Sequence, residues 1–177
     1  MRRGDELKAK HEQAVAERFI QKYNAERKTN FAFKKRGRPP APDFEYADLT
    51  TGKVIGIEVT EVYYDEHQAK GNWQVARGEV KKFQSNIIVN PTEHLRKFVE
   101  DGIAKKCQKN YDFSYPIILV LDSTIPPLHD ESDIEEIEEM IRQVKLPERI
   151  SFHEIYLGIE LKLGQYKVWK LYPRKSD

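Results

Sequence analysis

The sequence is poor in cysteine, in unbalanced charge and in long apolar runs. Cys107 is the single cysteine, so neither an intramolecular disulfide nor a zinc site with several thiolates can form. The 30 Lys and Arg residues nearly match the 29 Asp and Glu residues, and a net charge of +1 excludes a chain that coats polyanions through its overall charge. Any contact with a nucleic acid must therefore be local.

The longest aliphatic run, residues 117–121, is far shorter than the ~20 residues that cross a bilayer. The first residues, MRRGDELKAKHEQ, lack the apolar segment of a secretory signal. We therefore expect a soluble, cytoplasmic protein without membrane contact. A length of 177 residues is usual for one domain, and the sequence leaves open whether two copies form a homodimer.

Several common catalytic signatures are absent too. The five histidines show no paired metal-ligand spacing, no serine lies in a Gly-x-Ser-x-Gly sequence, and the nine glycines form no phosphate-binding loop. These absences give little support to a serine nucleophile, a histidine-held metal or a nucleotide-binding loop.

Hydrophobic periodicity predicts a mixture of helices and strands. Helices are expected at residues 5–27, 79–83, 92–110 and 133–144. Strands are expected at residues 30–35, 44–49, 54–63, 116–122, 150–163 and 165–172. The predicted fold class is α/β, with one mixed β-sheet covered by helices in a single domain over residues 1–177.

The second and third predicted strands form a hairpin with carboxylates on one face. With the turn centred at residues 51–52, Asp43 lies opposite Thr60 and Glu45 lies opposite Glu58. Three carboxylates on one face repel one another unless water or a cation lies between them, and oxygen ligands without thiolates suit Mg²⁺ or Mn²⁺. The alternative is the ordinary polar face of a solvated hairpin.

Lys106 falls near the middle of the apolar stripe of the helix predicted at 92–110. An ammonium group that faces inward is costly unless it is paired or used, so Lys106 is expected to have a partner. Lys105 and Lys109 lie away from the centre of the stripe, and Lys97 points nearly opposite to it. The alternative for Lys106 is a side chain that extends to the rim of the core.

Glu12 raises the same question in the first helix, because it shares a stripe with Ala16 and Phe19. It could pair with Lys106, extend to the rim of the core, or take part in a site.

Together these features resemble the PD-(D/E)XK nuclease superfamily, which has a restriction-endonuclease-like fold. Pro42-Asp43 matches the PD element at the start of a strand, and Glu58-Val59-Thr60 stands where the acid-x-Lys element belongs. The predicted order of elements matches the family core αβββαβ over about residues 10–122, with a C-terminal helix and strands added. The Glu-x-Thr sequence after a short hairpin is similar to that of a bacterial subgroup of this superfamily.

The resemblance implies a Mg²⁺- or Mn²⁺-dependent nuclease that hydrolyses phosphodiester bonds, with DNA as the expected substrate. It implies that Asp43, Glu58 and the Val59 carbonyl hold the metal ion. Glu12 would join these ligands through a water molecule or support them from behind. A bound metal lowers the pKa of a coordinated water and neutralises the phosphodiester, so an acidic pocket can accept a polyanion.

The chain departs from the family pattern at Thr60, where the usual residue is Lys. Lys106 is the candidate for the missing ammonium group, which would orient the attacking water and offset charge on the phosphate. If Lys106 does not reach the acids, the site is degenerate, and the fold would act as a DNA-binding or protein-interaction module.

A basic run at residues 34–38 is expected to contact the nucleic-acid backbone through Lys35, Arg36 and Arg38. The sequence Arg36-Gly37-Arg38-Pro39 also resembles the core of an AT-hook, which inserts an extended Arg-Gly-Arg into the narrow minor groove of A·T-rich DNA. The metal requirement separates the two interpretations, because a hook binds DNA without a divalent metal and a nuclease cuts only with one.

Overall fold

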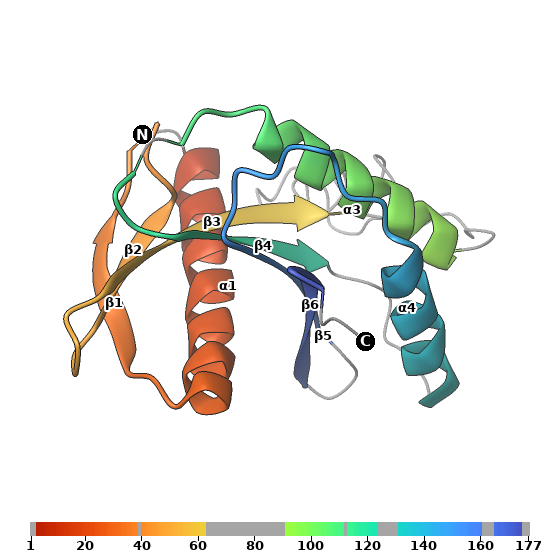
Figure 1. Cartoon of the computed structure of the whole chain (residues 1–177), viewed down its shortest axis with the longest axis horizontal. Coiled ribbons are helices and arrows are strands. Elements are labelled where there is room, and N and C mark those ends of the chain that lie inside the picture. Colours follow the sequence, from red (N-terminus) through yellow and green to blue (C-terminus); the bar gives the residue numbers. More distant parts are fainter. Residues whose placement is uncertain are drawn as a thin grey trace.

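The computed structural model describes residues 3–38, 40–62, 91–111, 113–123, 131–160 and 165–174. These residues form three helices and six strands (Figure 1): α1 (Arg3–Arg27), β1 (Phe31–Arg36), β2 (Phe44–Asp48), β3 (Val54–Val62), α3 (Pro91–Cys107), β4 (Ile117–Ser123), α4 (Glu131–Gln143), β5 (Glu154–Glu160) and β6 (Tyr166–Tyr172). The predicted α/β class is confirmed. The short helix predicted at 79–83 lies outside the described residues.

All six strands join one mixed sheet in the order β1-β2-β3-β4-β5-β6. The pairs β1–β2, β2–β3 and β5–β6 are antiparallel, whereas β3–β4 and β4–β5 are parallel. The carboxyl ends of β1, β3, β4 and β5 therefore meet at one edge of the sheet, together with the start of β2.

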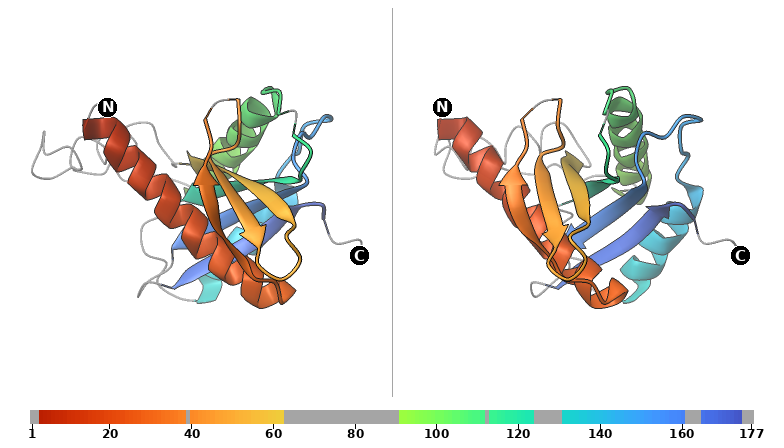
Figure 2. Two further views of the ribbon diagram at one scale, coloured as in Figure 1. Left: turned by 90° about the vertical axis from the view of Figure 1, so that its left-hand side faces the viewer. Right: turned by 60° about the vertical axis from the view of Figure 1, so that its left-hand side comes forward.

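Helices cover both faces of the sheet, with α1 on one face and α3 and α4 on the other (Figure 2). The core on the α1 side includes Val15, Phe19, Phe44, Ile57 and Val120. The core on the opposite side includes Val99, Ile103, Leu119, Ile137 and Leu157. Because both faces are covered, all seven residues of β4 are buried.

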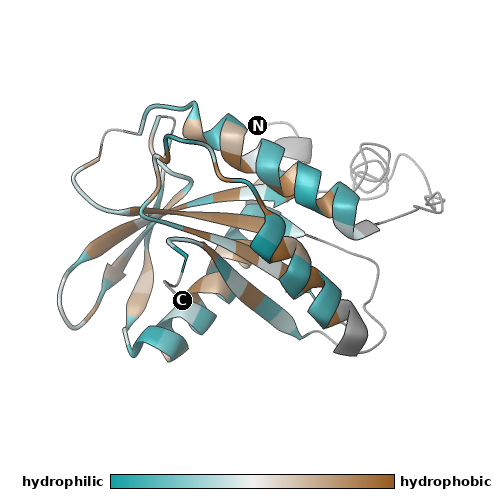
Figure 3. Ribbon diagram, turned by 45° about the vertical axis from the view of Figure 1, so that its right-hand side comes forward, coloured by the Kyte–Doolittle hydropathy of each residue, from teal (hydrophilic) through white to brown (hydrophobic). Residues whose placement is uncertain are grey.

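The helices are amphipathic, with apolar bands turned toward the sheet and hydrophilic outer sides (Figure 3). Within the described residues, no helix combines the length and the apolar character that crossing a bilayer requires.

The fifth strand is shorter than predicted, since β5 begins at Glu154 rather than at residue 150. Phe152 is buried and Ile150 is half-buried in the core without belonging to a strand. Core-filling residues of a connecting segment therefore produced part of the predicted strand signal.

The β2–β3 hairpin has the predicted faces but not the predicted register. Phe44 lies opposite Ile57 and Glu45 lies opposite Gly56, two residues from the expected pairing. A shift of two keeps every side chain on its face, because side chains alternate with a period of two. The pairing that was expected between Glu45 and Glu58 is therefore wrong, and Asp43 is instead level with Glu58.

Hydrogen bonds of the turn explain this register. The Asp48 carboxylate accepts the backbone N–H of Thr50 at 2.8 Å and that of Thr51 at 3.3 Å. Gly52 has a φ of 70° and donates its N–H to the Asp48 carbonyl at 2.8 Å, while Asp48 N–H bonds the Lys53 carbonyl. The left-handed conformation favours glycine, and the turn is centred between Thr50 and Thr51.

Gly158 of β5 allows Tyr166 of β6 to lie flat against the sheet. A Cβ atom at Gly158 would lie 1.8 Å from the Tyr166 hydroxyl oxygen and 2.4 Å from the ring carbon that bears it. We predict that Gly158→Ala lowers the free energy of unfolding by about 1–3 kcal/mol, the usual cost of overpacking. Urea denaturation measures this loss.

The control for this prediction is the same substitution in a Tyr166→Ala background, where no ring stands in the way. The cost of Gly158→Ala should be much smaller there, because the two positions are coupled by direct contact. Equal costs in both backgrounds would contradict the steric explanation.

Candidate functional site

Asp43, Glu58 and Lys106 meet around the backbone of Val59. Lys106 Nζ donates to Glu58 Oε1 at 2.6 Å and to the Val59 carbonyl at 3.3 Å. The Val59 N–H donates to Asp43 Oδ2 at 2.9 Å. Strand β3, the start of β2 and the last turn of α3 therefore supply one side chain each to a single cluster.

Local packing explains why these three elements converge. Asp43 directly precedes β2. Its carboxylate accepts the Val59 N–H of β3, which lies beyond the first residue of β2 and so has no β2 carbonyl as a partner. On the other side, α3 approaches the sheet closely at Gly102, where a Cβ would lie 3.2 Å from Leu121 and 3.3 Å from Val62. Lys106 lies one helical turn after Gly102, so this close approach carries its ammonium group to β3.

The cluster is largely removed from solvent. The side chain of Glu58 is 4% exposed and that of Lys106 is 15% exposed. Lys109 Nζ lies 3.7 Å from the same Glu58 oxygen, although its side chain is 56% exposed. Lys109 was expected away from the centre of the helical stripe. It nevertheless comes near Glu58, because α3 ends at Cys107 and the Lys109 N–H bonds the Lys106 carbonyl.

Burial is the main influence on the pKa of Asp43, and nearby carboxylates add to it. Burial, together with the charges of Glu58 and Glu12, raises the pKa of Asp43 to about 6, against the lowering effects of the Val59 N–H and of Lys106. An Asp carboxyl with a pKa near 6 exchanges its proton close to neutral pH.

Glu12 lies near this cluster without joining its hydrogen bonds. Its carboxylate is 3.6 Å from Arg36 at the end of β1 and 3.6 Å from Lys8 one turn earlier in α1. It does not form the ion pair with Lys106 that was one of the alternatives. Through Arg36 it links the acidic cluster to the basic run.

Glu45, the third carboxylate of the predicted set, belongs to a different cluster. It lies 3.1 Å from Lys35 Nζ and 3.6 Å from Lys34 Nζ, and it accepts a hydrogen bond from the Tyr115 hydroxyl at 2.9 Å. Burial tends to raise the pKa of Glu45, but the hydrogen bonds from Lys35 and Tyr115 outweigh it and the net shift is downward. Glu45 therefore anchors the basic run and does not face Glu58.

The residues predicted to bind nucleic acid remain accessible. Lys35 and Arg36 have side chains that are 60% and 48% exposed, and Arg38 is exposed just after β1. Because Arg36 is beside Glu12, this basic surface borders the acidic cluster.

Tyr111 is a member of the site that the sequence did not indicate. Its hydroxyl is buried without a hydrogen bond of normal geometry, and burial and the nearby Glu58 and Asp43 carboxylates raise its pKa. It lies in the segment after α3, where no helical period identifies which side chains turn inward. Its hydroxyl therefore lies beside the Glu58 carboxylate.

A second charged network lies on the opposite face of the sheet and was also missed. His11 Nε2 is 3.1 Å from Glu61 and 3.8 Å from Asp122, and Arg18 is 3.9 Å from Asp122. Burial raises the pKa values of Glu61 and Asp122. This network ties α1 to the carboxyl ends of β3 and β4, which positions the neighbouring Glu12.

The oxygen atoms around Val59 fit a hard divalent cation. Glu58 Oε1 and the Val59 carbonyl both accept hydrogen bonds from Lys106, so these two oxygens already share one cation, the Lys106 ammonium. Within the described residues, no group of three or more His, Cys, Asp or Glu side chains is arranged to hold a metal ion. The donor set consists instead of two carboxylates and a carbonyl.

No protein-family model, no curated protein and no solved structure matches the chain.

The raised pKa of Asp43 predicts how the stability of the metal-free protein changes with pH. Because the folded-state pKa, about 6, exceeds the ordinary 3.8, the folded state holds the Asp43 proton more tightly than the unfolded state. Relative to Asp43→Asn, the free energy of unfolding should therefore fall by about 2–3 kcal/mol as the pH rises from 4 to 7, at 1.36 kcal/mol per pKa unit.

Urea denaturation in EDTA at intervals between pH 4 and pH 7 measures this difference. Asp101→Asn, which changes an exposed carboxylate of α3, is the matched control and should leave the pH profile as it is in the parent. Parallel profiles for the parent and Asp43→Asn would show that Asp43 titrates normally.

Proposed function

We propose that the protein is a Mg²⁺- or Mn²⁺-dependent nuclease of the PD-(D/E)XK type that hydrolyses phosphodiester bonds of DNA. The observation that carries this proposal is the meeting of Asp43, Glu58 and Lys106 around Val59. The element order α1-β1-β2-β3-α3-β4 supports it, since this is the αβββαβ order of that superfamily's core. Helix α4 and strands β5 and β6 would be additions to the core.

Asp43, Glu58 and the Val59 carbonyl would hold the metal ion. A bound Mg²⁺ would activate a water molecule and neutralise charge on the phosphate. Lys106 has three N–H donors, of which two contact Glu58 and Val59, so one remains for a phosphate oxygen or the attacking water. Such a fixed donor stabilises charge that develops in the transition state.

The Thr60 substitution is compatible with activity. A Cβ atom at Gly102 would lie 3.9 Å from Thr60 Cγ2, so the Thr60 side chain packs against α3 on the same face as Glu58. A Lys from α3 can therefore replace a Lys from β3. The contact between Lys106 and Glu58 favours this interpretation over a degenerate site.

A noncatalytic AT-hook receives less support. Arg36 lies within β1 opposite Phe44, and Gly37 N–H bonds the Asp43 carbonyl at 2.8 Å. A hook requires an extended Arg-Gly-Arg that can enter a minor groove, and here half of that segment is part of the sheet.

Cleavage assays with single substitutions test the proposed function. Asp43→Ala should abolish both Mn²⁺ binding in calorimetry and cleavage of linear or circular DNA. Lys106→Ala should lower the cleavage rate on the order of 10² or more while the protein still binds Mn²⁺ and DNA, as expected when a fixed donor to the transition state is lost.

Lys97→Ala is the matched control on the same helix, because Lys97 lies 3.7 Å from Glu93 with a side chain that is 62% exposed. It should cut at the parental rate. Equal losses for Lys97→Ala and Lys106→Ala would remove Lys106 from the mechanism. A parent protein that cuts neither DNA nor RNA with Mg²⁺ or Mn²⁺ would favour the degenerate interpretation.

Salt dependence tests the proposed DNA surface. Replacing Lys35, Arg36 and Arg38 by Gln should reduce the slope of log affinity against log salt by up to ~3, at about one per lost phosphate contact. Fluorescence anisotropy in EDTA measures the slope without cleavage. The matched triple Lys22→Gln, Lys28→Gln and Lys53→Gln changes the same number of exposed charges elsewhere and should leave the slope unaltered.

A further inference from the structure

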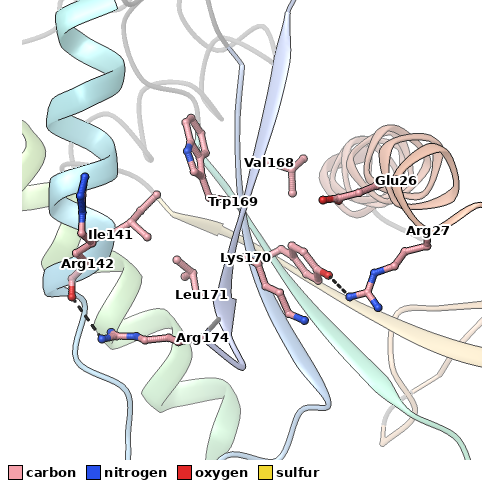
Figure 4. A pocket seen from close by; sticks show the side chains of 10 residues that line it. Glu26, Arg27, Ile141, Arg142, Val168, Trp169, Lys170, Leu171 and Arg174 are labelled. Atoms are coloured by element: carbon pink, nitrogen blue, oxygen red, sulfur yellow. Dashed lines mark hydrogen bonds between the residues drawn. The ribbon is translucent and has the colours of Figure 1, made fainter. Parts of the chain in front are cut away.

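The outer edge of β6 borders a groove that the proposed nuclease function does not use. The pocket has a volume of about 830 Å³ and lies between the end of α1 and α4 (Figure 4). Its lining includes Val168, Trp169, Lys170 and Leu171 of β6. Strands β4 and β5 separate β6 from β3, so this groove is distinct from the candidate nuclease site.

The groove runs along the edge of β6 and is lined by residues from both faces of that strand. Four consecutive residues of β6 line it, although successive side chains point to opposite faces of the sheet. At about 3.3 Å per residue, this stretch is roughly 13 Å long. Among the described strands, β6 pairs only with β5, so its other edge presents backbone N–H and C=O groups without a strand partner.

Within the described residues, lysine side chains do not guard this edge against strand addition. Natural edge strands are commonly guarded by lysines that project from the edge. Here the two lysines of β6 are drawn onto the faces of the sheet, since Lys167 Nζ bonds Glu138 at 3.0 Å and Lys170 Nζ bonds Glu154 at 2.6 Å. Among the described residues, these two lysines therefore do not cover the backbone edge between them.

Cations stand on both sides of the edge. On the α1 side, Arg27 and Lys170 share the buried carboxylate of Glu154, at 2.5 Å and 2.6 Å. Burial tends to raise the pKa of Glu154, but the lowering effects of Lys170 and Arg27 outweigh it and the net shift is downward. This carboxylate therefore stays ionised next to the two cations.

On the α4 side, Arg174 donates to the carbonyls of Arg142 and Val144 near the end of that helix. Arg142 of the same helix is among the residues that line the pocket, and its Nε lies 3.5 Å from Glu139 (Figure 4). The lining as a whole contains the cations Arg27, Arg142, Lys170 and Arg174 and the single carboxylate of Glu26. Glu154 lies beside Arg27 and Lys170, and Glu139 lies beside Arg142. With these two carboxylates included, the four cations still exceed the three carboxylates by one, and the groove fits an anionic occupant.

We propose that this groove binds an extended acidic segment of a partner polypeptide, which adds to β6 as a further strand. The side chains of an added strand would alternate between the two faces. One acidic side chain would meet Arg27 and Lys170, and the next would meet Arg142 and Arg174. Backbone hydrogen bonds to β6 would supply affinity, and the flanking cations would select acidic sequences.

A polypeptide fits the groove better than a nucleic acid does. Phosphates could pair with the same cations, but they do not present alternating N–H and C=O groups at the spacing of a strand edge. The open backbone edge of β6 would then remain unused. Strand addition uses both the edge and the charges.

Selection from a phage-displayed random peptide library on the whole protein tests the proposal. Enriched peptides should be acidic and rich in β-forming residues, and a synthetic copy of the best peptide should bind in fluorescence anisotropy. Arg142→Glu combined with Arg174→Glu should weaken this binding at least tenfold. The matched control, Lys53→Glu combined with Lys97→Glu, makes the same charge change at exposed positions elsewhere and should not weaken it.

N-methylation of alternate backbone nitrogens in the peptide provides a test that leaves the protein unaltered. Methylation removes the N–H donors of one edge of the peptide, so one of the two alternating patterns should abolish binding and the other should preserve it. Enrichment without acidic bias, equal binding by the Arg142 and Arg174 variant, or insensitivity to both methylation patterns would overturn the proposal. Displacement of the peptide by single-stranded DNA at lower concentration than unlabelled peptide would reassign the groove to a nucleic acid.

Discussion

The hydrogen bond between Lys106 and Glu58 is the contact on which the candidate site depends. Glu58 is nearly inaccessible to water, and a buried carboxylate without a counter-charge would be costly. Lys106 supplies that charge from another layer of the fold, and its second contact, with the Val59 carbonyl, holds it at the same strand residue whose N–H holds Asp43. One backbone residue of β3, Val59, therefore positions both the Asp43 carboxylate and the Lys106 ammonium group.

Although the chain is nearly neutral overall, its acidic and basic side chains form separate local clusters near the candidate site. The basic run at the end of β1 is held by Glu45 and Glu12, which leaves the long side chains of Lys35 and Arg36 half in solvent beside the acids. Across the sheet, a partly buried network fixes α1 to the same edge. The acids, the bordering cations and the anchored helix are thus assembled from segments far apart in the sequence, although no large excess of either charge exists overall.

Hydrophobic periodicity made much of this arrangement predictable. It identified the described helices, the strands and the inward position of Lys106, because a repeating apolar pattern reports which side of an element is buried. It could not determine the hairpin register, since two registers that differ by two residues bury the same side chains and only the Asp48 turn selects between them. Tyr111 was missed because it follows the last turn of α3, where no period continues. Lys109 was misplaced because the helix was predicted to run to residue 110, whereas α3 ends at Cys107.

The mixed topology of the sheet also has a consequence for how the protein folds. Strands β2 and β3 are joined by a tight turn, so the pairing that brings Asp43 level with Glu58 is local in sequence and closes quickly. The parallel pairing of β3 with β4 joins residues that are much farther apart in the sequence, and α3 lies between these two strands along the chain. Two carboxylates would therefore be gathered before their ammonium partner, and their mutual repulsion would make the hairpin poorly stable until α3 docks.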